Sequence, residues 1–237
     1  MIEFAKELAA LSALTRSLLD WEERSGVGGL VFDPSKSAPK PQEQRVSIQK
    51  ETSLAEPLSV LQREAEQCTD CELHRGRTHS VFSRGTADAD LLFLGEGPGF
   101  HEDQQGVPFV GPAGQLLDKM IAAMGLDGDS VYICNVVKCR PPNNRTPVAA
   151  EANACSRFLV PQIDQVHPKV IVALGKCAAE NLGCVPRDNR RWRGTWRTFR
   201  GYPVMPTYHP AFLLRSPEFK RVVWQDLQQV MAKLLSP

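Results

Sequence analysis

Four cysteines carry the strongest chemical signal in this sequence of 237 residues. Cys68 and Cys71 form a Cys-x-x-Cys pair, whose spacing lets two thiolates reach one metal centre from a single turn of chain. Cys139 and Cys155 follow much later in the chain. Thiolates in a set of four suit either an iron–sulfur cluster or a zinc ion, and spacing alone leaves both open. The other three cysteines show no ligand spacing.

A glycine- and proline-rich segment, residues 95–114, lies between the two pairs of cysteines and contains six glycines and three prolines. Glycines let the backbone approach a ligand closely, and Phe109 offers a flat face on which a base could stack. The acids Glu102 and Asp103 could orient water or stabilise a cationic sugar, or they could cap the helix that follows. The segment lacks the G-x-G-x-x-G pattern and a P-loop lysine, so a nucleotide cofactor is not expected.

Polar side chains with useful chemistry follow two further segments. The amide of Asn135 has a donor and an acceptor, so it can pair with one edge of a pyrimidine. Asn143 and Asn144 follow a Pro-Pro pair and could aim an amide at water or phosphate. His209, in Tyr-His-Pro, is a candidate hydrogen-bond donor to developing negative charge. A single asparagine or a single histidine commonly has a structural role. The argument for a site therefore depends on the placement of these residues together.

The elements expected to position these side chains alternate between strands and helices. This alternation predicts a three-layer α/β/α sandwich around a central four-stranded, mainly parallel sheet. Ligands of such sheets bind beyond the carboxyl ends of the strands, where the residues above fall. A helix from Thr146, with Thr146 as N-cap and Pro147 in first position, is expected after Asn144. The expected strands are 89–94, 131–137, 169–174 and 202–207, and the main helices are 111–124, 146–163, 176–182 and 218–235.

Composition and patterning set the outer organisation of the chain. We expect an N-terminal helix over residues 1–24, a flexible linker over 25–55 and a catalytic domain over 56–237. An odd number of cysteines without a secretion signal indicates the cytoplasm, and no apolar run is long enough to span a membrane. The net charge is only +1, but residues 187–200 hold six arginines among aromatic residues. That segment is either a DNA-binding surface or a solvated hairpin.

Together these segments resemble the uracil-DNA glycosylase superfamily, and specifically its family 4 enzymes with an iron–sulfur cluster. The family motif G-E-A-P-G-x-x-E-D-x-x-G-x-P-F-V-G-x-A-G-x-L-L appears as G-E-G-P-G-F-H-E-D-Q-Q-G-V-P-F-V-G-P-A-G-Q-L-L. The second and third motifs appear as N-V-V-K-C-R-P-P-N-N-R and P-T-Y-H-P-A-F-L-L-R, so the resemblance covers about residues 65–235. It implies an enzyme that flips deoxyuridine out of DNA and hydrolyses its N-glycosidic bond. Uracil release of this kind starts base excision repair.

The resemblance also implies roles for individual residues. The four cysteines would hold a 4Fe–4S cluster, and catalysis would involve Glu102, Asn144 and His209. The residues expected at the uracil are Glu96, Gly97, Phe109, Asn135 and His209. The residues just after His209 are candidates for a wedge that fills the vacated base stack, and arginines nearby are candidates for phosphate contacts. The expected DNA-binding residues are Arg193, Phe212, Leu213, Leu214 and Arg215.

Two glycines depart from related motifs. Gly97 stands where family 1 enzymes have a water-activating aspartate and where family 4 usually has alanine. Gly99 stands where family 1 has a tyrosine that crowds a thymine methyl group, so Gly99→Tyr is expected to tighten discrimination against thymine.

Three alternatives stay open. A covalent uracil-binding relative carries a basic, histidine-containing insertion that this chain lacks after Cys139. A non-catalytic iron–sulfur DNA-binding module would keep the cysteines but would not need Asn135 or His209. A zinc site could use the same four cysteines. The expected partner is uracil-containing DNA, single- or double-stranded, bound by a monomer, and a candidate role for residues 1–55 is to bind another repair or replication protein.

Overall fold

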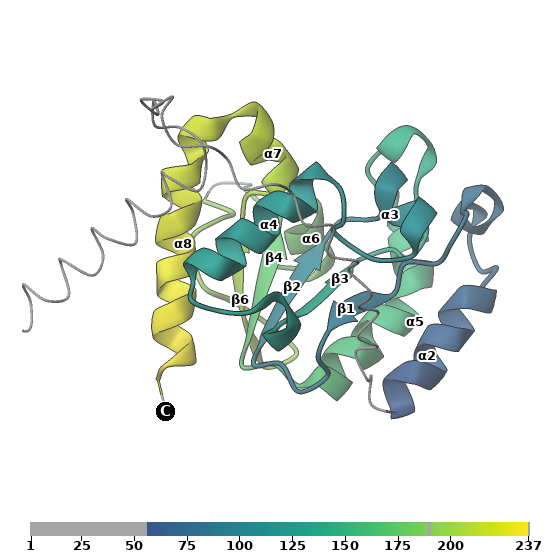
Figure 1. Cartoon of the computed structure of the whole chain (residues 1–237), viewed down its shortest axis with the longest axis horizontal. Coiled ribbons are helices and arrows are strands. Elements are labelled where there is room, and N and C mark those ends of the chain that lie inside the picture. The colour runs from purple at the N-terminus through teal and green to yellow at the C-terminus, as the bar shows by residue number, and fades with distance from the viewer. Residues whose placement is uncertain (1–55, 189–190, 237) are drawn as a thin grey trace, which may run out of the picture. The chain divides into compact units, whose positions relative to one another are not determined.

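A six-stranded sheet forms the centre of the computed structural model, which describes residues 56–188 and 191–236 (Figure 1). Its strand order is β1-β3-β2-β4-β6-β5. The inner four strands run parallel, whereas β1 is antiparallel to β3 and β5 is antiparallel to β6. The predicted N-terminal helix 1–24 and linker 25–55 lie outside the described residues. The strands are β1 (Ser83–Gly85), β2 (Leu91–Gly95), β3 (Tyr132–Asn135), β4 (Val170–Leu174), β5 (Arg197–Phe199) and β6 (Tyr202–Thr207).

The four expected strands are the four inner strands, and the prediction of a four-stranded sheet is corrected by the two edge strands. Each edge strand has three residues, and neither contains the apolar run that identified the others. β1 contains serine, arginine and glycine, and β5 lies within the arginine-rich segment. Short, charged edge strands are a common way to end a sheet without exposing a long unpaired edge.

Side chains of the inner strands alternate between two cores, which makes the fold three-layered. Leu92 and Leu94 of β2 enter one buried cluster, and Leu91 and Phe93 enter the other, because successive strand residues point to opposite faces. The first core packs beneath α2, α5 and α6, and the second beneath α4, α7 and α8 (Figure 1). These helices are α2 (Glu56–Gln67), α4 (Pro112–Ala123), α5 (Ala149–Val166), α6 (Lys176–Asn181), α7 (Pro210–Arg215) and α8 (Lys220–Leu234).

The start of α5 differs from the expectation. The helix begins at Ala149 with Val148 as N-cap, so Thr146 and Pro147 precede it. The carboxylate of Glu151 accepts a hydrogen bond from the Val148 amide at 2.9 Å and thereby caps the helix end. The remaining short helices are α3 (Phe100–Gln105), η1 (Glu72–Gly76), η2 (Gly128–Ser130), η3 (Pro142–Asn144) and η4 (Pro217–Phe219). Within the described ranges no helix combines the length and apolar character needed to cross a membrane.

Candidate active site

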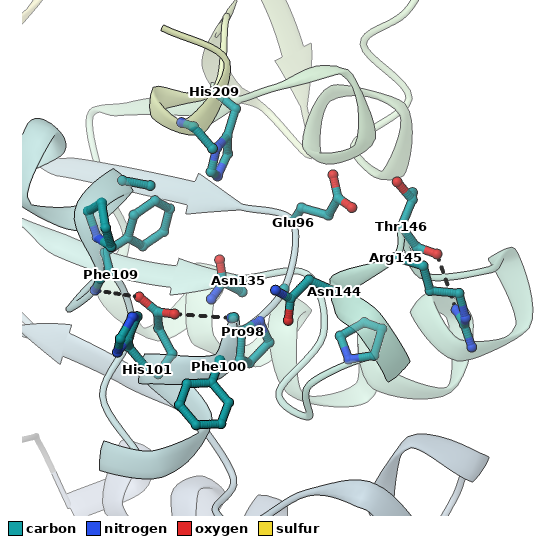
Figure 2. Close-up of a pocket in the computed structure, with 18 of the residues that line it drawn as sticks. Glu96, Pro98, Phe100, His101, Phe109, Asn135, Asn144, Arg145, Thr146 and His209 are labelled. Carbon is teal, nitrogen blue, oxygen red and sulfur yellow. Dashed lines mark hydrogen bonds between the residues drawn. The ribbon is translucent and has the colours of Figure 1, made fainter. Parts of the chain in front are cut away.

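A cleft of about 550 Å³ opens at the carboxyl ends of β2, β3 and β6. Figure 2 shows Phe109, Asn135 and His209 around it, with Glu96, Asn144, Arg145 and Thr146 on one side. The structure therefore brings together all of the predicted catalytic and uracil-binding residues. The lining also includes Pro98, Phe100 and His101, which sequence reasoning did not single out although they belong to the same glycine-rich loop.

Phe109 is held in an unusual backbone conformation. Its φ is 56°, in the left-handed region that non-glycine residues rarely adopt. Gly114, in the first turn of α4, makes room for it, because a Cβ there would lie 1.8 Å from the Phe109 carbonyl oxygen. Such a conformation costs on the order of 1–3 kcal/mol and persists only where the surroundings impose it. The Phe109 ring is 5 % exposed and stacks with the His209 ring at 5.6 Å.

Asn135 ends β3 with an unsatisfied acceptor. The residue is 2 % exposed, and its Oδ1 is buried without a hydrogen-bond partner among residues 56–188 and 191–236. Gly95 opposite it allows this placement, because a Cβ there would lie 2.2 Å from Asn135 Oδ1 and 2.6 Å from Phe109 Cζ. A buried acceptor without a donor is rare and costly in a folded protein. A hydrogen-bond donor on a bound ligand could satisfy this oxygen.

His209 is a neutral hydrogen-bond donor. The Ala211 amide donates to its Nδ1 at 3.1 Å, so in the neutral ring the proton resides on Nε2. The pKa of His209 is lowered to about 4, mainly by burial and also by the positive charge of Arg215, while Glu102 acts in the opposite direction. At neutral pH the ring is therefore uncharged. Figure 2 shows it pointing into the cleft, above Asn135.

Glu102 ties the glycine-rich loop together. Its carboxylate accepts hydrogen bonds from the amides of Gly99 at 3.1 Å, Val110 at 2.9 Å and Gly111 at 2.8 Å. These contacts join the start of α3 to the start of α4. Asp103 is 2 % exposed and accepts from the Thr78 amide at 2.8 Å. Glu102 therefore has the helix-capping role that the sequence left as one alternative, whereas Asp103 holds the chain at Thr78 and caps no helix with its side chain.

The loop after β3 presents Asn144 to the cleft. Asn143 and Asn144 both have positive φ values, 55° and 54°, which asparagine tolerates better than most residues. Arg140 Nε donates to Asn144 Oδ1 at 2.7 Å. Arg145 forms two hydrogen bonds with the Glu151 carboxylate, at 2.8 and 2.6 Å. Asn144 thus has its side-chain oxygen engaged, and its side-chain nitrogen is left to donate.

Comparison of the sequence with known proteins identifies the family to which this chain belongs. The model of the uracil DNA glycosylase superfamily matches residues 82–228. The chain belongs to this superfamily. The chain is 42 % identical over 184 residues to the type-4 uracil-DNA glycosylase of Thermotoga maritima, covering 73 % of this chain and 93 % of the relative. It is 39 % identical over 189 residues to the type-4 enzyme of Sulfurisphaera tokodaii, covering 76 % and 86 %.

A type-5 relative is matched over less of the chain. The type-5 uracil-DNA glycosylase of Pyrobaculum aerophilum is 36 % identical over 146 residues, covering 54 % of this chain and 63 % of the relative. The type-4 relatives match more of this chain, and the chain therefore belongs with the type-4 members of the uracil-DNA glycosylase superfamily.

The residues predicted to contact DNA occupy different positions in this glycosylase fold. Phe212 and Arg215 line the cleft, and Leu214 is 48 % exposed. Leu213 is 1 % exposed inside the core, so the structure does not support it as a DNA wedge. Arg193 forms an ion pair at 3.0 Å with Asp226, which is only 2 % exposed, and its guanidinium lies over the Tyr208 ring. Arg193 does not line the cleft.

The four cysteines of the type-4 glycosylase chain come together around one small cavity. They come from three segments separated in sequence and are free thiols in the structure. Two of the sulfurs accept hydrogen bonds, Cys139 Sγ from Arg77 Nη1 at 3.2 Å and Cys155 Sγ from the Lys138 amide at 3.3 Å. Within the described ranges, no three His, Cys, Asp or Glu side chains form a group that could hold a single metal ion.

Proposed function

We propose that this protein is a uracil-DNA glycosylase that acts on deoxyuridine flipped out of the DNA stack. The observation that carries the proposal is the cleft in which the Phe109 ring, the unpartnered Asn135 oxygen and the neutral His209 ring face one another. Membership of the type-4 family supports it, because the curated relatives are named uracil-DNA glycosylases. Chemistry on a base requires extrusion from the duplex, since the reacting atoms are inaccessible within it.

The amide of Asn135 explains how uracil is selected. The N3–H of uracil would satisfy the orphaned Oδ1, and Asn135 Nδ2–H would donate to uracil O4. Cytosine has the opposite pattern at these positions, with an acceptor at N3 and an amino group at C4. Phe109 would stack on the ring, and Glu96 and Gly97 line the same cleft. Binding cytosine would leave buried polar groups facing groups of the same kind, which disfavours it.

His209 is placed to act on the leaving group. When the C1′–N1 bond breaks, its electron pair passes to uracil, and negative charge develops on O2. The Nε2–H of His209 would donate to that oxygen, a contribution of roughly 3–4 kcal/mol for one well-placed donor. Water then adds to C1′ of the cationic sugar, and the proton that it loses passes through solvent to the released uracil anion. We assign Asn144 to orient this water, and the Glu102 carboxylate to contribute negative charge near the sugar.

The DNA itself would be held around the mouth of the cleft. Leu214, being exposed, would fill the space that the flipped nucleotide leaves, with Phe212 and Arg215 beside it. We keep as proposals that Arg193 contacts DNA, that single- and double-stranded uracil DNA are both substrates and that the enzyme works as a monomer in the cytoplasm. Binding of another repair or replication protein by residues 1–55 is likewise a proposal.

The activity is tested with labelled strands that contain one deoxyuridine, alone and paired opposite guanine or adenine. The expected result is an abasic site that alkali converts to a strand break at the uracil position, with free uracil released. The matched strand containing thymidine is the control, and Asn135→Ala should remove most of the uracil cleavage. Cleavage that is equal for uracil and thymine, or absent for both, would contradict the proposal.

We further propose that Cys68, Cys71, Cys139 and Cys155 hold a 4Fe–4S cluster. Four thiols around one cavity, with N–H donors directed at two sulfurs, suit a thiolate-bound centre. The cluster would fix three distant segments in place rather than take part in electron transfer. Anaerobically purified protein should contain iron and sulfide and absorb broadly in the visible range, and Cys68→Ala should lose both and unfold more easily. Stoichiometric zinc without iron would contradict this assignment.

A further inference from the structure

Lys138 is a fully buried lysine with no acidic partner in the part of the chain that the structure describes. It is 1 % exposed, and its Nζ donates to the backbone carbonyl of Asn135 at 2.7 Å. The ring of Phe82 lies 5.8 Å from the same nitrogen. Burying an ammonium group away from a counter-charge is expensive, so a residue of this kind requires an explanation.

The carbonyl that Lys138 contacts belongs to the residue expected to read uracil. The amide of Val136 donates to Gly95 on β2, so the carbonyl of the same peptide unit, that of Asn135, points away from β2 toward β1. The β1 pairing has already stopped there, because its last pair is Ser83 with Cys134. Lys138 Nζ therefore donates to the Asn135 carbonyl in place of a backbone amide, which β1 would have provided if its pairing with β3 had continued. It fixes the end of β3 from which the Asn135 side chain enters the cleft.

The same lysine forms part of the wall of the cysteine cavity. Lys138 lines that cavity together with all four cysteines, and its backbone amide donates to Cys155 Sγ. Arg77 is a further cation at the cysteines, and its guanidinium contacts Cys139 Sγ and the carbonyls of Cys68 and Glu66. Arg77 touches only the cysteine side, whereas Lys138 touches both the cysteines and Asn135. The two residues therefore provide a matched pair for a test.

We propose that Lys138 is a positioning residue that couples the four-cysteine site to uracil recognition. The negative charge of a thiolate-bound centre balances the buried ammonium, and the ammonium holds the carbonyl of Asn135. A loaded cysteine site then keeps Asn135 in its uracil-reading position, and loss of the centre leaves Lys138 without a counter-charge and frees the end of β3. This inference rests on the proposed function and on the proposed cluster.

The experiment compares the parent protein with Lys138→Met and Arg77→Met. Iron content and visible absorption are measured for each, and the iron-loaded fraction is used for binding. The Kd for a strand with one 2′-fluoro-deoxyuridine, which resists hydrolysis, is divided by the Kd for the same strand with thymidine. Amide hydrogen exchange is followed over residues 132–138, in each variant and in the parent before and after iron removal.

In iron-loaded Lys138→Met, the preference for uracil over thymine should fall about tenfold or more, with faster exchange over 132–138. Iron-loaded Arg77→Met should keep the parent preference, even if it retains less iron. Iron removal from the parent should speed exchange over 132–138. An unchanged preference in Lys138→Met, an equal loss in Arg77→Met, or unchanged exchange on iron removal would each overturn the coupling. A parent that releases no uracil would refute the proposed function instead, and the exchange measurements would still decide the coupling.

Discussion

At the scale of single residues, His209 allows leaving-group stabilisation to be separated from water activation. His209→Ala should lower single-turnover cleavage roughly a hundredfold or more while leaving DNA affinity nearly unchanged, because the lost donor acts on charge that develops only during cleavage. A 5-fluorouracil leaving group is more acidic and needs less help, so its penalty should be much smaller. Asn144→Ala should show less rescue by 5-fluorouracil, since its target is not the leaving group. Equal penalties for both bases in the His209 variant would defeat the assignment.

The lowered pKa of His209 gives the same residue a pH signature. Its folded pKa of about 4 lies below the ordinary value, so the ring is neutral, with Nε2–H available, over the whole range above that pH. The rate of cleavage should therefore show no pH dependence near pH 6.5 that is due to His209. The pH–rate profiles of the parent and of His209→Ala should have the same shape in that range. Stability also depends on this pKa. As the pH falls, the ring is protonated in the unfolded chain before it is protonated in the folded protein, and this favours unfolding. The contribution of His209 is complete above about pH 6.5 and is lost as pH falls toward 4.

The identities of the main site residues could be predicted, but their conformations could not. Phe109, Asn135 and His209 stand in long motifs, so their place in one site was accessible from sequence. The left-handed backbone of Phe109 and its dependence on Gly114 arise from contacts between loop and helix that no local pattern encodes. The expectation for Gly99→Tyr also changes. A Cβ at Gly99 would lie 2.7 Å from Glu102 Oε2, so the larger side chain would disturb the Glu102 contacts.

At the scale of elements, the Glu102 carboxylate joins α3 to α4, and Glu102→Gln tests this joint. Glutamine offers one acceptor oxygen where three amides now bind two, so the variant should lose about 1–3 kcal/mol of stability, and cleavage should slow as Phe109 shifts. Denaturant unfolding and single-turnover rates measure the two effects. Asp103→Asn, whose carboxylate holds Thr78 outside the cleft, is the control and should alter stability more than rate. Normal stability with no cleavage in Glu102→Gln would indicate a direct chemical role only.

Prediction of the elements succeeded where hydrophobic patterning is strong. β2 and β4 are continuous apolar runs buried on both faces, and β3 and most of β6 are buried as well, which is the signal that made the inner strands recognisable. β1 and β5 form by hydrogen bonding to the outer edges of β3 and β6. Their formation therefore depends on the completed sheet and not on a local sequence pattern. The start of α5 was misplaced for a related reason, since the Glu151 side chain supplies the cap that Thr146 was expected to supply.

At the scale of the whole molecule, variants of Arg193 and Arg215 separate arginines that stabilise the fold from arginines that bind DNA. Arg215→Ala should weaken binding similarly for all DNA sequences and reduce the salt slope by about one, because Arg215 lines the cleft. Arg193→Ala should instead destabilise the fold by about 3–5 kcal/mol, since it leaves the buried Asp226 carboxylate without its counter-charge and with only the Thr207 hydroxyl as a hydrogen-bond donor among the described residues. Titrations at several salt concentrations and denaturant unfolding measure both. An altered salt slope with unchanged stability in Arg193→Ala would place that residue on the DNA path.

The stacked pair of Phe109 and His209 joins positions 100 residues apart in the chain. Closing a chain segment of that length costs about 4 kcal/mol of entropy, which only the completed sheet can offset. β6 is the last strand in sequence and carries His209 at its end, so a chain shortened before β6 has Asn135 but no pocket. High contact order of this kind makes recognition a property of the finished fold. A partly folded chain therefore lacks the stacked pair, and removal of a base requires a protein whose sheet is complete.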